Sequence, residues 1–210
     1  MISLSEILHT IAQALMIPCL IILLVLMAGA VWQIGDIVVE YIAERRKHKC
    51  DVPQLLRDVH TAGADGLADL IETSGLLRRQ KKALLELAES RGLPKDTLTA
   101  LAERLLATEE ARNARTTSIT DMIAKLGPMF GLLGTLIPLG PGIVALGQGD
   151  TVTLSESMNV AFDTTIAGVI SAAVASVISH IRKRWYNDDM VSLETLMEAV
   201  LEEVTSDVEG

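Results

Sequence analysis

The segment "AFDTTIAGVISAAVASVISH" (residues 161–180) has the length and composition of a membrane-spanning helix, yet polar side chains fall within its first turns. About 20 apolar residues in helical form cross a hydrocarbon core about 30 Å thick. Asp163, Thr164 and Thr165 interrupt the apolar run. An acid at a helix centre costs roughly 2.5 to 3.5 kcal/mol on insertion scales, so intramembrane acids face protein or water. We therefore expect one side of this helix to face a protein interior or a hydrated path.

The composition of the whole chain is typical of a membrane protein. Half of its 210 residues are hydrophobic and aromatic residues make up only 3%, so the apolar side chains are small and aliphatic. The net charge of −9 is a property of the tail, because the residues after Arg184 include acids but no Lys or Arg. The two cysteines, Cys19 and Cys50, offer neither a disulfide framework nor a metal-ligand spacing.

Three stretches are long enough to cross a bilayer as helices. Residues 7–35 and 126–149 contain no Asp, Glu, Lys or Arg, and Asp163 is the only such residue within 157–181. A cleaved signal peptide is the alternative for the first stretch, but it would have a basic start and a shorter apolar region. We predict an all-α, polytopic and oligomeric membrane protein with three transmembrane helices, the first of them retained.

Basic residues indicate the orientation, since short cytoplasmic loops are enriched in Lys and Arg. They lie in "ERRKHK" (44–49), in "RKRW" (182–185) and between Arg57 and Lys125, which is one side of the predicted membrane. The N-terminus and the turn "GQGDTVT" (147–153) are then outside, and the C-terminus is cytoplasmic. The predicted parts are an N-terminal transmembrane helix (1–42), a cytoplasmic helical insert (43–120), a core of two transmembrane helices (121–185) and an acidic amphipathic tail (186–210).

The insert is predicted to be helical. Leucines recur at three- and four-residue spacing in "LADLIETSGLLRRQKKALLELAES" (67–90), which predicts a packing seam. "RGLPKD" (91–96) predicts a break, with Gly92 at a helix end, Pro94 stopping propagation and Asp96 as the next N-cap. No strong breaker follows between Thr97 and Gly127, so one helix should continue into the second span and couple the two parts rigidly.

The tail segment "VSLETLMEAVLEEV" (191–204) has one apolar face, which predicts an amphipathic helix. An isolated helix of this size is marginal in water, so this face should pack on the insert or on copies of itself. We favour packing within an oligomer over binding to the membrane surface, because the helix is acidic and an anionic leaflet prefers basic side chains.

Small residues recur every four positions in both core spans. Such stripes let helix backbones approach closely in lipid, although a chance distribution would also place some small residues in an apolar helix. The stripes comprise Gly127, Gly131 and Thr135 in the second span, and Thr164, Gly168, Ala172 and Ser176 in the third. In the segment "IPLGPG" (137–142), Pro138 and Pro141 remove backbone donors, which predicts a kink or an early end of regular helix.

The motifs "GPMFGLLGTLI" (127–137) and "AFDTTIAGVISAA" (161–173) together resemble the paired signature of the MotA/TolQ/ExbB proton-channel family. The three-helix topology resembles its TolQ/ExbB branch. This resemblance implies a pentamer around a dimer of an ExbD/TolR/MotB-like single-span protein with a membrane aspartate, in a prokaryotic inner membrane. It places path-lining threonines at Thr135 and Thr165 and the family's helix-start proline at Pro128, and it adds Gly134 to the glycines expected to pack helices.

Asp163 departs from the pattern of the TolQ/ExbB branch, in which the acidic residue is a glutamate about one turn earlier in the helix, near Val160. Asn159 lies four residues before Asp163 on the same helix face, and the two could border a hydrated opening or contact the partner. Two residues along a helix turn by about 200°, so Asp163 and Thr165 should point in different directions. Alternatively, Asp163 is a structural acid.

Threonine suits a proton path because its hydroxyl is both a donor and an acceptor without charge. The alternative is that each hydroxyl only bonds a carbonyl of its own helix. We favour an ion path that includes Thr135, Thr164 and Thr165, in a channel subunit that conducts protons or sodium ions for an energy-coupling motor. The alternative function is a non-conducting membrane scaffold. No motif predicts an enzyme, a cofactor, a metal site or nucleic-acid binding.

Overall fold

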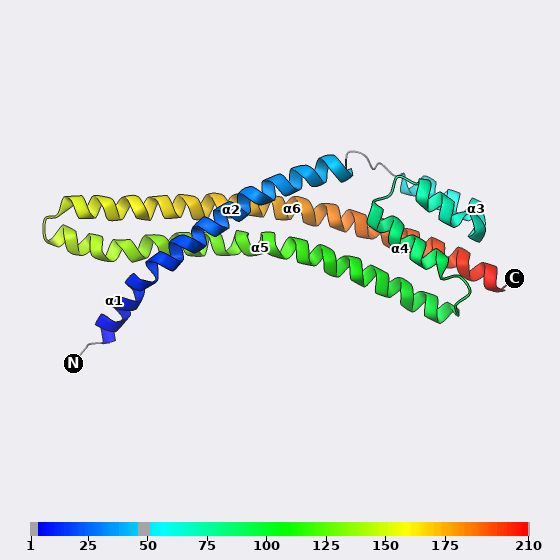
Figure 1. Ribbon diagram of the computed structural model, residues 1–210, viewed down its shortest axis with the longest axis horizontal. Helices are drawn as coiled ribbons and strands as arrows, with labels where there is room; N and C mark the ends of the chain where they lie inside the picture. The colour runs from blue at the N-terminus through cyan, green and yellow to red at the C-terminus, as the bar shows by residue number, and fades with distance from the viewer. Residues whose placement is uncertain (1–3, 46–50, 210) are drawn as a thin grey trace. The chain divides into compact units, whose positions relative to one another are not determined.

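The structure is a computed structural model that describes residues 4–45 and 51–209. It is 93% helical and contains no strand in these ranges, so the predicted all-α fold is confirmed. Three helical segments are long and apolar enough to cross a membrane, namely Glu6–Ala43, Lys95–Gly147 and Thr151–Ser206. The elements in Figure 1 are α1 (Leu4–Ala14), α2 (Met16–Glu40), the short π-helix η1 (Tyr41–Arg45), α3 (Val52–Thr73), α4 (Arg78–Glu89), α5 (Lys95–Gly147) and α6 (Thr151–Glu209).

The chain forms two compact units, and α5 and α6 contribute to both. Unit 1 comprises Met1–Ile37 and Thr117–Ile181, and unit 2 comprises Val38–Thr116 and Arg182–Gly210. The basic residues at 46–49 and Cys50 lie outside the described residues.

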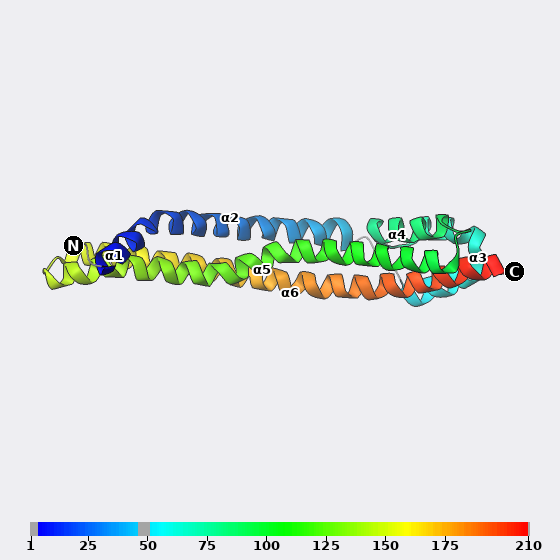
Figure 2. The ribbon, with the colours of Figure 1, turned by 90° about the horizontal axis from the view of Figure 1, so that it is seen from below.

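In unit 1, α2 crosses α5 and α6 at an angle and packs on both of them (Figure 1, Figure 2). Their shared apolar core is small and consists of Leu26, Ala30, Ile123 and Ala175. Many large apolar side chains of the same helices are exposed, including Leu24, Val25 and Leu132. Exposed apolar surface on this scale is typical of helices that face lipid or other chains.

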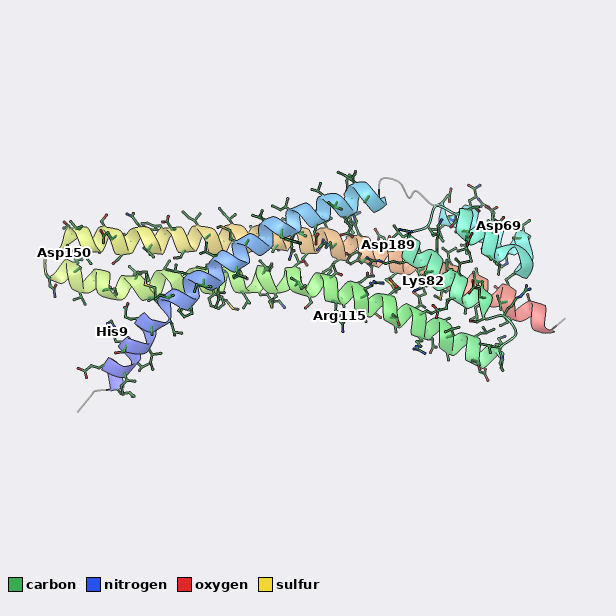
Figure 3. All side chains as sticks on the ribbon, in the orientation of Figure 1. His9, Asp69, Lys82, Arg115, Asp150 and Asp189 are labelled. Carbon is green, nitrogen blue, oxygen red and sulfur yellow. The ribbon has the colours of Figure 1, made fainter. Side chains whose placement is uncertain are left out.

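A tight turn joins α5 to α6, and Asp150 lies in it (Figure 3). The Asp150 carboxylate accepts hydrogen bonds from the Thr153 hydroxyl at 2.6 Å and from the backbone N–H groups of Val152 and Thr153, both at 3.1 Å. These bonds, the Thr153 hydroxyl first, lower the pKa of Asp150. The turn also uses Gly149, whose φ of 74° suits glycine. Asp150 therefore caps the start of α6.

Unit 2 has a larger and leucine-rich core. Its buried members come from all four of its helices: Leu55, Val59, Leu67 and Ile71 of α3, Ala83, Leu84, Leu87 and Ala88 of α4, Leu98 and Ala102 of α5, and Leu193, Leu196, Met197, Ala199, Val200 and Val204 of α6. The apolar face of the tail thus packs on the insert of its own chain, which is the first of the two predicted alternatives.

Local capping explains where the helices of the insert begin and end. The Asp51 carboxylate accepts from the Gln54 backbone N–H at 3.4 Å and starts α3. The Gln80 side chain accepts from the Leu77 backbone N–H at 3.2 Å at the start of α4, and its amide donates to the Asp189 carbonyl of α6 at 3.0 Å. Gly92 has a φ of 97° in the predicted break, and α5 begins at Lys95, so Asp96 lies in the first turn of α5 rather than at its N-cap.

The expected early end of regular helix at residues 137–142 is wrong, because α5 continues through Pro138 and Pro141 to Gly147. A proline removes one backbone donor and leaves the carbonyl four residues earlier without its helical partner. For Pro141 this is the Ile137 carbonyl, which accepts from the Gln13 side-chain amide at 3.5 Å. The first span is also divided, since α1 ends at Ala14 and α2 begins at Met16.

Candidate functional site

The closest approach of α5 and α6 occurs at glycines. A methyl group added to Gly168 would lie 2.5 Å from the Gly127 carbonyl oxygen and 2.8 Å from the Gly131 Cα atom. A methyl group added to Gly127 would lie 2.7 Å from the Gly168 carbonyl oxygen and 3.0 Å from the Ala172 Cβ atom. Each distance is shorter than a normal van der Waals contact, so only glycine permits the two backbones to lie this close.

Thr164 fills the next part of the same contact. It is buried, and its Cβ atom would lie 2.7 Å from a methyl group added to Gly134. Its hydroxyl donates to a carbonyl of its own helix, with Val160 at 2.9 Å and Ala161 at 3.0 Å. The side chain therefore packs against α5, where its hydroxyl is enclosed by the two helices of one chain.

Thr135 and Thr165 are only partly buried. The Thr135 hydroxyl donates to the Leu132 carbonyl at 2.6 Å, and the Thr165 hydroxyl donates to the Ala161 carbonyl at 3.0 Å. A threonine hydroxyl has one hydrogen and two lone pairs. Both side chains can therefore still accept a hydrogen bond from water, even though their hydrogens are bonded to their own helices.

Asp163 and Asn159 are exposed and lie one turn apart on α6. They belong to a different face of α6 from Thr164 and Gly168, which are buried against α5. The structure thus brings the glycines, Thr164 and Ala172 together, but it does not bring Asp163 or Asn159 into that contact. Of the prolines, Pro128 lies inside α5 beside Gly127, so its place at the entry of the second membrane span stays a prediction.

Sequence reasoning missed a group of buried polar side chains in unit 1. The Ser179 hydroxyl of α6 lies 2.5 Å from a carboxylate oxygen of Asp121 of α5. Gln33 of α2 and Thr120 of α5 are also buried. Their polarity within apolar stretches was visible in the sequence, but their burial depends on packing between helices distant in the chain.

A second missed group lies in unit 2. Arg182 and Glu40 form an ion pair at 3.2 Å, and their side chains are only 5% and 16% exposed. Tyr186 hydrogen-bonds to Glu40. Tyr41 stacks on Trp185 with ring centroids 6.1 Å apart. Removing one member of a buried ion pair costs about 3 to 5 kcal/mol, because the other charge is left buried without its partner.

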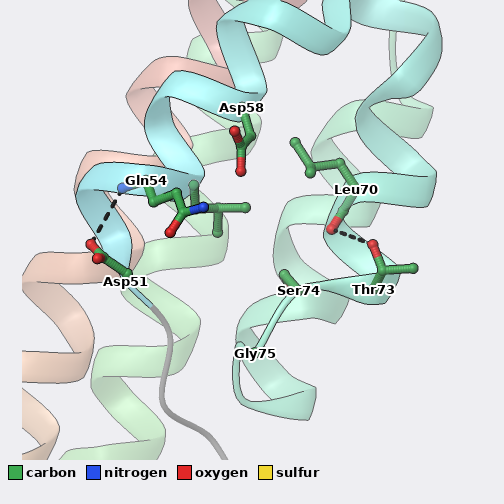
Figure 4. A pocket seen from close by; sticks show the side chains of 8 residues that line it. Asp51, Gln54, Asp58, Leu70, Thr73, Ser74 and Gly75 are labelled. Atoms are coloured by element: carbon green, nitrogen blue, oxygen red, sulfur yellow. Dashed lines mark hydrogen bonds between the residues drawn. The ribbon is translucent and has the colours of Figure 1, made fainter.

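A shallow pocket of about 250 Å³ lies between the two ends of α3 in unit 2 (Figure 4). Two of its polar side chains have structural partners, because Asp51 caps α3 and the Thr73 hydroxyl donates to the Asp69 carbonyl at 2.8 Å. No group of three or more His, Cys, Asp and Glu side chains that could hold a metal ion occurs in the part of the chain that the structure describes.

Comparison with known proteins agrees with this arrangement of helices. No curated protein matches the chain. The family model of the MotA/TolQ/ExbB proton channel family matches residues 71–195, a range that includes the close contact of α5 with α6 and extends into unit 2 on both sides. This range is more than half of the chain. The chain therefore belongs to the MotA/TolQ/ExbB proton channel family.

Proposed function

We propose that this chain is the ion-conducting subunit of an energy-coupling membrane motor, with protons or sodium ions as the transported species. The observation that carries the proposal is the family match over 71–195, which covers both helices of the glycine contact. Family membership supports a channel-type role. One charge that moves through 100 mV releases about 2.3 kcal/mol, which is enough to drive a conformational step.

In this proposal, the lone pairs of Thr135 and Thr165 line the ion path. Both side chains are partly buried and retain acceptor capacity, whereas Thr164 is enclosed between α5 and α6. The glycine contact has a structural role, because it fixes α5 against α6 and so holds the two threonines in a constant geometry. Asp163 and Asn159, exposed on another face of α6, would contact a neighbouring subunit or the partner.

The partner would be an ExbD/TolR/MotB-like single-span protein whose membrane aspartate takes up and releases the ion. Residues 7–35 of this chain contain no Asp or Glu, so its first span does not supply that carboxylate. The exposed apolar surface of unit 1 supports assembly in a bilayer. We further propose a TolQ/ExbB-like homopentamer around a dimer of the partner, in a prokaryotic inner membrane with the N-terminus outside.

The test replaces Thr135 and Thr165 with valine and measures ion-gradient-dependent work in membranes that contain the partner. We expect the double variant to lose most of this work, since valine keeps the shape of threonine but cannot accept a hydrogen bond. Thr108→Val is the matched control, because the Thr108 hydroxyl also donates to a carbonyl of its own helix, that of Arg104 at 2.8 Å, but lies in unit 2. Full activity of the double variant would remove the path-lining role.

A non-conducting scaffold is the competing function. One observation favours it, since the hydroxyls of Thr135, Thr164 and Thr165 all donate to carbonyls of their own helices. Purification from native membranes separates the two functions. A co-purifying single-span protein with a membrane aspartate is expected for the channel, and co-purification of other components without such a protein would favour the scaffold.

A further inference from the structure

Three polar side chains lie one helical turn beyond the apolar core of unit 1, each on a different helix. The pairs of core residue and polar residue are Ala30 and Gln33 on α2, Ile123 and Thr120 on α5, and Ala175 and Ser179 on α6. Residues three or four apart lie on the same side of a helix, so each polar side chain extends the face that forms the core.

The three polar residues lie at the same end of that core. Cys19 bonds the Phe130 carbonyl and Gly29 faces Ile123, so α2 and α5 run in opposite directions. A step forward along α2 is therefore a step backward along α5. The hydrogen bond from Ser179 to Asp121, the residue after Thr120, places Ser179 of α6 at the same height along the helices as Thr120 of α5.

Two of these side chains are buried, and each has a polar atom that no described residue satisfies. Thr120 is 0% exposed and Gln33 is 5% exposed. The Gln33 Oε1 atom and the Thr120 Oγ1 atom have no hydrogen-bond partner among the residues that the structure describes. Buried polar atoms in native proteins are almost always paired with protein or with bound water, so these two atoms indicate a ligand.

We propose that Gln33, Thr120 and Asp121 bind a buried water molecule between α2, α5 and α6. The Gln33 Oε1 atom can only accept, whereas the Thr120 hydroxyl has a hydrogen to donate. A water molecule donates to Gln33, accepts from Thr120 and keeps a second hydrogen for the Asp121 carboxylate. A bare metal cation fits less well, because it accepts no hydrogen bond from Thr120.

This water site gives the subunit a group that can accept and release a proton, the Asp121 carboxylate, which the path lined by Thr135 and Thr165 does not contain. The Ser179 hydroxyl lies 2.5 Å from one Asp121 oxygen, which fixes the carboxylate against α6. When the water passes a proton to Asp121, one O–H bond of the water breaks and one forms on the carboxylate. The hydroxide that remains takes a proton from a further water molecule in the path, which restores the bound water. This relay role depends on the proposed channel function, whereas the water site itself does not.

The site is tested by infrared spectroscopy of the full-length protein in lipid, with ordinary water and with water labelled with oxygen-18. We expect an O–H stretching band that shifts with the label, is lost in Gln33→Leu and Thr120→Val, and returns in Thr120→Ser. Thr108→Val should keep the band. Circular dichroism shows that each variant is folded. A label-sensitive band that is equal in all variants, or that is missing from the wild type, would overturn the water site.

The relay is tested by proton flux through the complex with its partner in vesicles. We expect Asp121→Asn to lose flux while it keeps the labelled water band. Wild-type flux in Asp121→Asn would overturn the relay. If that variant and the Thr135/Thr165 double variant both keep full flux, the channel proposal fails as well, and the infrared result still decides the water site separately.

Discussion

Units 1 and 2 are both built from long helices, but they are held together differently. In unit 1 the closest contacts are between backbones, at Gly127 and Gly168, and the apolar core is small. In unit 2 one core contains seventeen buried apolar side chains, of which sixteen lie on four helices and one, Leu76, lies between α3 and α4. Unit 1 exposes its large apolar side chains, whereas unit 2 encloses most of its own.

The difference reflects the solvent in which each unit folds. Burial of leucine against leucine gains free energy only when the alternative is water, as for a helical bundle in an aqueous environment. In lipid, helices associate by close packing and polar contacts, so glycine, alanine and threonine occupy the interface. The comparison predicts that truncating large side chains destabilises unit 2, whereas adding small groups destabilises unit 1.

The largest effect is expected for Leu87→Ala in unit 2. Leu87 is fully buried, and replacement of a buried leucine by alanine costs about 2 to 5 kcal/mol because it leaves a cavity. Hydrogen exchange of the amides of α3 and α4 measures the loss. Leu93→Ala is the control, since Leu93 is 41% exposed and should lose little. Equal loss of protection in α2 of unit 1 would show that the two units unfold as one.

A smaller loss of stability is expected for Gly168→Ala in unit 1, where the substitution adds a methyl group instead of removing a large side chain. The added methyl group would meet the Gly127 carbonyl and the Gly131 Cα atom, and overpacking of this kind costs about 1 to 3 kcal/mol. Thermal unfolding in lipid measures the cost. Gly35→Ala has no atom within 4 Å of its new methyl group and should leave the unfolding temperature the same or higher. Equal unfolding temperatures for the two variants would contradict the backbone contact.

The smallest effect is expected for Gln13→Leu, which removes the donor to the Ile137 carbonyl. A hydrogen bond of this kind contributes about 0.5 to 1.5 kcal/mol. Pro141→Ala restores the helical N–H that would satisfy the same carbonyl, so Gln13→Leu should cost less in that background. A double-mutant cycle of unfolding free energies measures the coupling. Additive effects would show that Gln13 does not compensate for Pro141.

The helices and spans could be predicted because they depend on local patterns. The uncharged stretches marked the three spans, the break at Gly92 and Pro94 was visible, and the long α5 followed from the lack of breakers after Thr97. Of the two effects predicted for Pro138 and Pro141, the early end of regular helix was wrong and the kink stays a prediction, because whether α5 continues depends on contacts with distant residues. The side chain that bonds the freed carbonyl belongs to Gln13, far away in the sequence.

The candidate site could be predicted only in part, for the same reason. The four-residue spacing of the small residues can be read from each helix separately. The sequence does not show that Gly127 and Gly131 of α5 lie against Gly168 of α6. The burial of Gln33 and Thr120 depends on three helices at once. The path-lining roles of Thr135 and Thr165 stay predictions.

A density map of the particle assembled with its partner in a membrane tests the central claim most directly. The account predicts that Thr135 and Thr165 border a hydrated path beside a second chain, whose aspartate lies at their level. Side chains of both threonines turned toward lipid, with no second chain at the centre of the particle, would contradict it.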